Sequence, residues 1–246
     1  MISLIAVIIQ ARMGSTRLPG KVMKNLCDKT VLAHDIERIR QAERIDEIII
    51  ATTTDPADDC IVGEAKKYGA TVFRGSEDDV LSRYYFAAKE FGADTIIRVT
   101  SDCPLIDPHI LDEVVRYYLD NSFDIVTNAG NDLSQRTYPR GLDVEIFSFH
   151  ALEDAQLHAT KKYQREHVTP YLYENGRVSY YKNTVDYSCY RWTLDTDEDW
   201  KLIEEIYSRL YHGEHNFYLN QIVDVMKKNP ELYDINKNVE QKKLGE

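Results

Sequence analysis

Between Leu4 and Thr127 the sequence alternates between short apolar runs and segments with helical periodicity. The runs that suit buried strands are Leu4–Ile9, Ile45–Ala51, Thr71–Arg74 and Thr95–Thr100. The segments that suit helices are Val31–Gln41, Asp58–Tyr68, Asp79–Phe91 and Asp107–Asn121. A strand–helix–strand order implies right-handed crossovers and a sheet covered by helices. We therefore predict an α/β, Rossmann-like fold with a mostly parallel central sheet.

The pattern changes after Asn128. Strands are expected at Val144–Ser148 and Val178–Lys182, with a helix at Phe149–His158 between them. Tyrosines crowd this region, and tyrosine is common at interfaces, so we predict a small excursion near residues 131–190 that forms the acceptor wall and a homodimer contact. The alternative is that these rings complete the core.

Thr196 is then expected to cap a helix that runs to Tyr211, with Asp199 completing a capping box. We predict a single domain over residues 1–246: a core at 1–128, the excursion at 129–190, and a return to the core with C-terminal helices at 191–246. The charged tail Lys237–Glu246 is expected to fray.

The chain has 246 residues and a formal net charge of -11. Binding nucleic acid over a broad surface needs the opposite sign, so no nucleic-acid partner is expected. An anionic ligand must instead meet a local basic cluster. The apolar run Leu4–Ile9 lacks the positive region and cleavage site of a signal peptide, so we expect a core strand there. Apolar stretches are too short to cross a membrane and the four cysteines are widely spaced, so we expect a cytoplasmic protein without a membrane contact.

One such basic cluster follows the first strand. Residues 10–21 read Q-A-R-M-G-S-T-R-L-P-G-K and bring three cations, Arg12, Arg17 and Lys21, into a loop with two glycines. A Gly-rich basic loop at the carboxyl end of a parallel strand suits a polyphosphate. The spacing fits neither a Walker A loop nor a dinucleotide fingerprint. A solvated basic turn is the alternative; the loop's place after a buried strand favours a phosphate site.

A carboxylate follows the fourth strand in the run R-V-T-S-D-C-P-L-I-D. Asp102 lies just past the strand end, where it can face a ligand in the same crevice. Mg²⁺ prefers a few carboxylates together with phosphate oxygens and water, so Asp102 is a candidate ligand. Asp107 is better explained as the N-cap of the next helix, with Pro108 at its first position.

These motifs, with R-W-T-L-D-T-D-E-D-W at 191–200, resemble those of the cytidylyltransferases that activate sugar acids, such as CMP-Kdo synthetases and acylneuraminate cytidylyltransferases. The similarity spans about Ile5 to Ile206. It is greatest to the branch that includes spore coat polysaccharide biosynthesis protein SpsF, and it implies the fold of the nucleotide-diphospho-sugar transferases.

The resemblance implies a role for each matching residue. The nucleotide-binding residues would be Gln10, Ala11, Arg12, Gly14, Ser15, Arg17, Lys21, Arg74 near the base, and Asp102. The substrate-binding residues would be Arg140, Asp143, Glu145, Glu166 and His167. Asp102 and Asp195 would hold Mg²⁺, although Asp197 replaces the proline of the family's V-D-T-P-E-D motif and remains an alternative ligand.

The implied activity is transfer of CMP from CTP to a sugar acid with release of pyrophosphate, in the synthesis of a surface or spore coat polysaccharide. Arg12, Lys21 and Asp102 would be its catalytic residues. Cys103 stands where CMP-Kdo synthetases carry an acidic residue, which argues against Kdo as the acceptor and leaves its identity open. Two alternatives also stay open: a nucleotide-sugar-dependent glycosyltransferase, although Ser101–Cys103 is not the usual D-x-D motif, and a non-catalytic nucleotide-binding regulatory protein.

Overall fold

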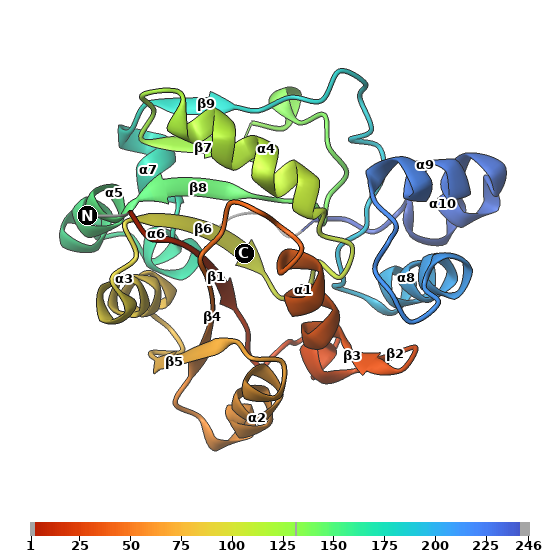
Figure 1. The fold of residues 1–246 in the computed structure, drawn as a ribbon, viewed down its shortest axis with the longest axis horizontal. Helices are drawn as coiled ribbons and strands as arrows, with labels where there is room; N and C mark the ends of the chain where they lie inside the picture. The colour runs from red at the N-terminus through yellow and green to blue at the C-terminus, as the bar shows by residue number, and fades with distance from the viewer. Residues whose placement is uncertain (1–2, 131, 242–246) are drawn as a thin grey trace.

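A seven-stranded sheet forms the centre of the computed structural model, which describes residues 3–130 and 132–241. The strand order is β5-β4-β1-β6-β8-β7-β9 (Figure 1). The strands are β1 Ile5–Gln10, β4 Glu47–Thr53, β5 Thr71–Gly75, β6 Thr95–Thr100, β7 Ile125–Thr127, β8 Glu145–Ser148 and β9 Val178–Tyr180. A separate hairpin pairs β2 Asn25–Leu26 with β3 Lys29–Thr30.

Helices lie on both faces of this sheet. They are α1 Val31–Ile39, α2 Asp59–Lys67, α3 Val80–Phe91, α4 Pro108–Leu119, α5 Phe149–His158, α6 Lys162–His167, α7 Pro170–Asn175, α8 Asp197–Leu210, α9 Leu219–Lys228 and α10 Glu231–Asn236. Short 3₁₀ helices occur at η1 Lys21–Met23, η2 Pro56–Asp58 and η3 Leu133–Gln135. The predicted α/β fold with a mostly parallel sheet is confirmed.

The central strand β1 shows why the runs read from the sequence are apolar throughout. It pairs in parallel with β4 and β6, so that Val7 lies opposite Ile48 and Ile97. Val7 packs in a core layer with α1, α2 and α4, whereas its neighbour Ile8 packs in the other layer with α3 and α5. Because each face is covered, neither set of alternating side chains needs to be polar.

The segment after Asn128 departs from this parallel order and then returns to the sheet. Both expected strands form, as β8 and β9. β8 runs antiparallel between β6 and β7, although it follows β7 in the chain. Helices α6 and α7, which the sequence pattern did not predict, connect α5 to β9. The region therefore adds strands at one side of the sheet and brings α6 against α3.

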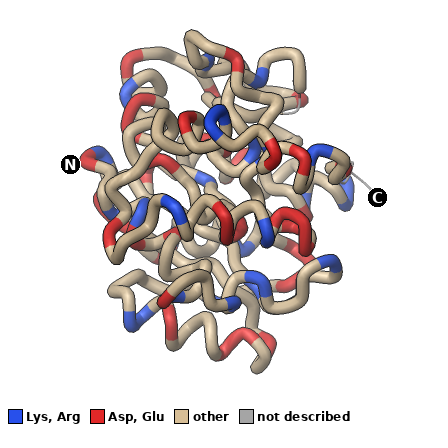
Figure 2. The backbone as a smooth tube through the Cα atoms, turned by 90° about the vertical axis from the view of Figure 1, so that its right-hand side faces the viewer, with Lys and Arg blue, Asp and Glu red and all other residues tan. Residues whose placement is uncertain are grey.

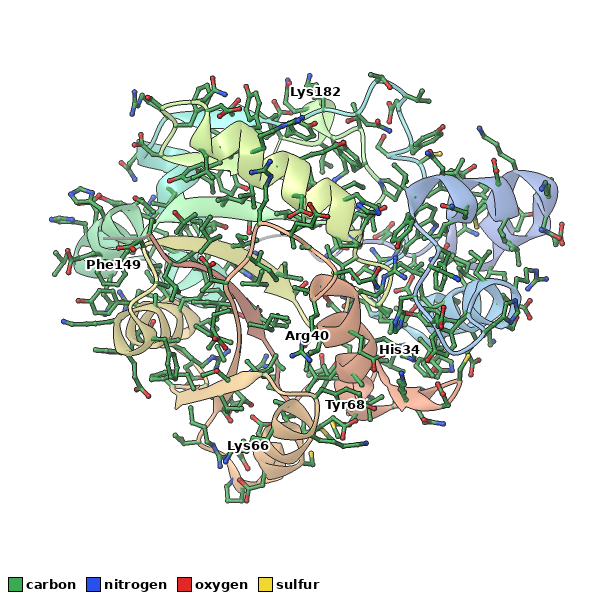
Figure 3. The ribbon with its side chains drawn as sticks, in the orientation of Figure 1. His34, Arg40, Lys66, Tyr68, Phe149 and Lys182 are labelled. Carbon is green, nitrogen blue, oxygen red and sulfur yellow. The ribbon has the colours of Figure 1, made fainter. Side chains whose placement is uncertain are left out.

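The C-terminal helices α8, α9 and α10 group beside α1 (Figure 1). Thr196 caps α8 and Asp199 completes the capping box, as predicted. His34, labelled on α1 in Figure 3, packs edge-on against Tyr207 of α8 at 4.7 Å between ring centroids and bonds His215 at 2.8 Å. Helices α9 and α10 lie within residues 191–246, where C-terminal helices were predicted, although bounds were predicted only for α8. Residues 242–246 of the tail that was expected to fray lie outside the described residues.

One further prediction concerns the start of α4, the helix that follows β6. The Asp107 carboxylate accepts hydrogen bonds from the backbone N–H groups of His109 at 2.9 Å and Ile110 at 3.4 Å, which confirms the predicted cap.

Basic and acidic residues are interspersed along the backbone (Figure 2). Across residues 3–130 and 132–241, no helix has both the length and the apolar character needed to span a bilayer.

Candidate active site

A cavity of about 410 Å³ opens at the carboxyl ends of β1 and β6. Its wall is formed by the loop after β1, by the loop after β5 with the start of α3, by the end of β6, by α6, and by Asp195. Five cationic and five anionic side chains line it, so its local charge is near neutral in a protein of net charge -11. A polyanion therefore meets less repulsion in this cavity than the net charge of the whole protein implies.

At its centre the Lys21 ammonium holds two carboxylates together. Lys21 Nζ donates to Asp102 Oδ2 at 2.7 Å and to Asp195 Oδ1 at 3.0 Å, and also to the carbonyl oxygen of Leu194 at 2.7 Å. Lys21 begins η1, Asp102 follows β6, and Asp195 precedes α8, so three distant segments meet here. The fold thus joins the basic loop and both predicted metal ligands.

These charges shift each other's protonation equilibria. Burial alone would lower the pKa of the Lys21 ammonium, but Asp102 and Asp195 outweigh burial and raise that pKa above its ordinary value. Burial would likewise raise the pKa of Asp102, but the Lys21 ammonium and hydrogen bonds from Thr100 and Cys103 hold it below its usual range. The carboxylate and the ammonium are both charged at neutral pH, as a site for phosphate and a cation requires.

The loop after β1 turns through a backbone conformation that favours glycine. Gly20 has φ 64°, in the left-handed region, and directly precedes Lys21. The other two cations of the loop are ion-paired within the cavity wall: Arg12 with Glu77 at 3.1 Å and Arg17 with Asp195 at 2.9 Å. All three loop cations therefore face the same space, each balanced by a carboxylate there.

Comparison with known proteins identifies the family of this chain. The cytidylyltransferase family model matches residues 6–238. This chain belongs to the cytidylyltransferase family.

Relatives within the family include Uncharacterized protein MJ1063 of Methanocaldococcus jannaschii, 42% identical over 97% of each chain. Spore coat polysaccharide biosynthesis protein SpsF of Bacillus subtilis is 34% identical over 91% of this chain and 94% of its own. The 3-deoxy-manno-octulosonate cytidylyltransferase of Geobacter sulfurreducens is 34% identical over 48% of this chain and 46% of its own. The solved structure of a cytidylyltransferase from Leptospira borgpetersenii is 38% identical and superposes with a TM-score of 0.88 over 98% of this chain and 100% of that one.

The structure brings most of the predicted site residues of this cytidylyltransferase into one cavity. Those that line it are Gln10, Ala11, Arg12, Gly14, Ser15, Arg17, Lys21, Asp102, Glu166, His167 and Asp195. Asp195 is among them, whereas Asp197 is the first residue of α8 and does not line the cavity. The geometry thus favours Asp195 over Asp197 as the partner of Asp102.

Arg74, predicted to face the base, does not line this cavity. It lies in β5 with its guanidinium turned to the neighbouring loop, where it donates to the carbonyl oxygens of Thr53 and Asp55 at 2.7 Å each and to Asp59 at 2.6 Å. Its observed contacts hold the loop after β4. A basic residue at a strand end looks the same in sequence whether its side chain faces a ligand or the protein.

The three predicted substrate residues between Arg140 and Glu145 also lie outside the cavity lining. Asp143 pairs with Arg136 at 2.7 Å. Glu145 pairs with Arg98 inside the fold. The backbone of Arg140 bonds the segment that leads to Asp195, since its carbonyl oxygen accepts from Trp192 N–H at 2.7 Å. The contacts of these three residues are therefore with other protein groups and not with the cavity.

Four charged residues of the wall were missed by sequence reasoning. Glu77 and Asp78 lie in the loop after β5, a strand end that the parallel-sheet rule already marks as a place for ligands. Arg83 lies on α3, which was predicted from its apolar residues alone. Lys162 lies on α6, a helix with no clear pattern in the sequence.

Proposed function

We propose that this protein transfers CMP from CTP to a hydroxyl of a sugar acid and releases pyrophosphate, in the synthesis of a surface or spore coat polysaccharide. Membership of the cytidylyltransferase family supports the nucleotidyl transfer. The similarity to SpsF and to the 3-deoxy-manno-octulosonate cytidylyltransferase supports the sugar-acid acceptor and the pathway. The observation that carries the proposal is the meeting of Lys21 with Asp102 and Asp195 in a cavity lined by the basic loop.

In this reaction the acceptor oxygen bonds to the α-phosphorus as the bond from that phosphorus to the bridging oxygen breaks, and the proton of the acceptor hydroxyl is released to water. Negative charge collects on the departing pyrophosphate, and catalysis asks mainly for positioning and charge neutralisation. Arg12, Arg17 and Lys21 lie on one side of the cavity and supply that positive charge. Glu166 and His167 of α6 line another part of the wall, where an acceptor would contact them.

The donor set at the centre fits Mg²⁺. Asp102 Oδ2 and Asp195 Oδ1 lie 2.7 Å and 3.0 Å from one cationic atom, Lys21 Nζ, so these two carboxylates would hold a metal ion in place of the ammonium. No set of three or more His, Cys, Asp or Glu side chains suited to a metal occurs among residues 3–130 and 132–241. Phosphate oxygens and water would complete the coordination, as is usual for Mg²⁺. When bound, Mg²⁺ would neutralise phosphate charge and orient the triphosphate.

Pyrophosphate release tests the proposal. The purified protein is assayed with each of the four NTPs and Mg²⁺, with a panel of sugar acids and with the matching neutral sugars. We expect release that needs CTP and a sugar acid together. A nucleotide sugar consumed without pyrophosphate indicates a glycosyltransferase instead, and nucleotide binding without turnover across the panel indicates a regulatory protein.

CTP preference has a binding test of its own. A ligand that binds the native state raises the melting temperature, so CTP should give a larger shift than ATP or GTP. Equal or larger shifts with the purine nucleotides contradict the pyrimidine preference.

The homodimer remains part of the proposal. It is motivated by the tyrosine-rich segment up to Tyr190, which offers large side chains with polar ends. Sedimentation at micromolar concentration should give the mass of a dimer, and a monomer there removes this element alone.

A further inference from the structure

The two carboxylate oxygens of Asp195 have different sets of partners. Oδ1 accepts from Lys21 Nζ at 3.0 Å, the ammonium that also binds Asp102. Oδ2 accepts a hydrogen bond from Arg191 Nη2 at 2.9 Å and forms an ion pair with Arg17 Nη2 at 2.9 Å. One oxygen is therefore directed to the position shared with Asp102, and the other is held away from it.

Arg191 is fixed in turn by a fully buried carboxylate, Asp199, which is 0% exposed. Asp199 accepts from Arg191 Nε at 2.9 Å and Nη2 at 3.0 Å, a two-point contact that restrains the plane of the guanidinium. It also accepts from the backbone N–H groups of Asp195 at 3.0 Å and Thr196 at 3.1 Å. The capping box of α8 explains the bond to Thr196 but not the bonds to Arg191.

The C-terminal helix completes the arrangement. Asn236, at the end of α10, is buried and donates from Nδ2 to Asp199 Oδ1 at 2.8 Å and to the carbonyl oxygen of Arg191 at 2.9 Å. Farther along, Gln241 Oε1 accepts from Arg191 Nη1 at 2.6 Å. Helix α10 and Gln241 are thus bonded to the residues behind Asp195, although the bonded pairs are 37, 45 and 50 residues apart in sequence.

We propose that Arg191, Asp199 and Asn236 are positioning residues that turn Oδ1 of Asp195 toward the metal position it shares with Asp102. This inference rests on the metal site of the proposed function. An unrestrained carboxylate rotates broadly about its last torsion, so either oxygen could face the site. Outer partners that fix a ligand's orientation commonly contribute ten- to a hundred-fold, roughly, to metal affinity.

The test measures Mn²⁺ affinity without nucleotide, from the electron paramagnetic resonance signal of free Mn²⁺. Arg191→Lys keeps the charge beside Asp195 and Asp199 but loses the two-point contact, and should weaken Mn²⁺ binding about ten-fold or more. Asn236→Ala removes the support from α10 without removing a charge, and should weaken Mn²⁺ binding less than Arg191→Lys does. Turnover of both variants should recover in part as Mg²⁺ is raised, since the defect is in metal binding.

Asn128→Ala is the matched control. Asn128 is also buried and also bonds backbone groups, with Nδ2 to the Leu142 carbonyl oxygen at 2.7 Å and Oδ1 to Val144 N–H at 2.8 Å. It does not line the cavity. The melting temperature of Asn128→Ala should fall as that of Asn236→Ala does, while the Mn²⁺ affinity of Asn128→Ala stays at the wild-type value.

Two further variants separate this inference from the function on which it rests. Asp102→Asn and Asp195→Asn should each abolish Mn²⁺ binding. If they do, and Arg191→Lys and Asn236→Ala change only the melting temperature, the positioning role is overturned and the metal site stands. If Asp102→Asn and Asp195→Asn leave Mn²⁺ affinity unchanged, the metal site and the positioning role both fail. If Arg191→Lys does not fold, the difference in Mn²⁺ affinity between Asn236→Ala and its control Asn128→Ala decides whether the positioning role holds.

Discussion

Two ion-pair clusters lie close together along β6, and they differ in what they face. In the open cluster, Lys21 binds Asp102 and Asp195, with side-chain exposures of 13%, 18% and 13%. In the closed cluster, Arg98 binds Glu145, with exposures of 15% and 10%. Burial is nearly the same. The open cluster lines the cavity, whereas neither Arg98 nor Glu145 does.

Protein groups bind both carboxylate oxygens of Glu145 in the closed cluster. Glu145 Oε1 accepts from Thr169 Oγ1 at 2.9 Å and from Tyr173 Oη at 2.5 Å, and its other oxygen binds Arg98. Burial and the charge of Glu145 raise the pKa of Tyr173 well above its ordinary value, so its hydroxyl stays a donor. Both oxygens of Glu145 are therefore bound by protein groups, and this carboxylate leaves neither oxygen for a ligand, although Arg98 Nε is buried without a hydrogen-bond partner among the described residues. Pairing and burial therefore do not identify a site; access to the cavity does.

The comparison of the open and closed clusters predicts that the largest effect on activity occurs at Asp102. Asp102→Asn keeps the side-chain shape but removes the charge, and should lower kcat for pyrophosphate release by roughly a thousand-fold or more, because several kcal/mol of charge stabilisation are lost. Asp195→Asn should behave alike. Asp197→Asn, on the exposed first turn of α8, is the control and should stay within a few-fold of wild type, by the small effects usual for surface changes. Full activity of Asp195→Asn with loss in Asp197→Asn would reverse the ligand assignment.

Glu145 should show the opposite pattern, with a loss of stability in place of a loss of activity. Glu145→Ala leaves Arg98 buried without its carboxylate, which should cost about 3 kcal/mol in the free energy of unfolding measured in urea. Arg98 also donates to Gln10 in the cavity wall at 3.2 Å, so kcat/KM should fall by less than about ten-fold through that contact. A large fall in activity with unchanged stability would place Glu145 in the substrate site, as the sequence resemblance implied.

Arg12 should affect activity without affecting stability. Its ion pair with Glu77 is exposed, with side-chain exposures of 47% and 50%, and such pairs contribute little to folding. Arg12→Ala should lower kcat/KM by roughly a hundred-fold, the scale of one lost charge-stabilising donor. Lys24→Ala is the control, because Lys24 lies over the Trp200 ring and does not line the cavity. Equal losses in both variants would mean that the loop acts only as a diffuse positive field.

The order of strands and helices up to Thr127 could be predicted because each element carries its own local signal. Parallel strands covered on both faces are apolar along their length, and Gly92 and Asp107 mark helix ends through backbone and capping requirements that any fold imposes. The basic loop and Asp102 could be found by the same logic, since the carboxyl ends of parallel strands share one edge.

The remainder depends on contacts between distant residues. Nothing local in Glu145 distinguishes a side chain that pairs with Arg98 from one that meets a substrate. The insertion of β8 between β6 and β7 is likewise a matter of pairing, which strand composition does not encode. Asn236 supports Asp195 through its bonds to Arg191 and Asp199, and no local sequence pattern connects these segments.

The smallest expected effect is at Lys162, a cation of the cavity wall that forms no ion pair with any described residue. Its charge is available to attract an anionic acceptor, but it lies on an exposed helix turn where solvent and salt screen it. Lys162→Ala should raise KM for the acceptor by a few-fold, roughly, with kcat unchanged, and the increase should shrink as ionic strength rises. The neighbouring Lys161 is the matched control, because it is bound to Glu174 at 3.3 Å and to Tyr163 at 2.9 Å and does not line the cavity. Lys161→Ala should leave KM unchanged at every salt concentration. If the two lysine variants shift KM equally, the attraction comes from the general charge of α6, and access to the cavity does not separate functional from structural charges at this edge of the site.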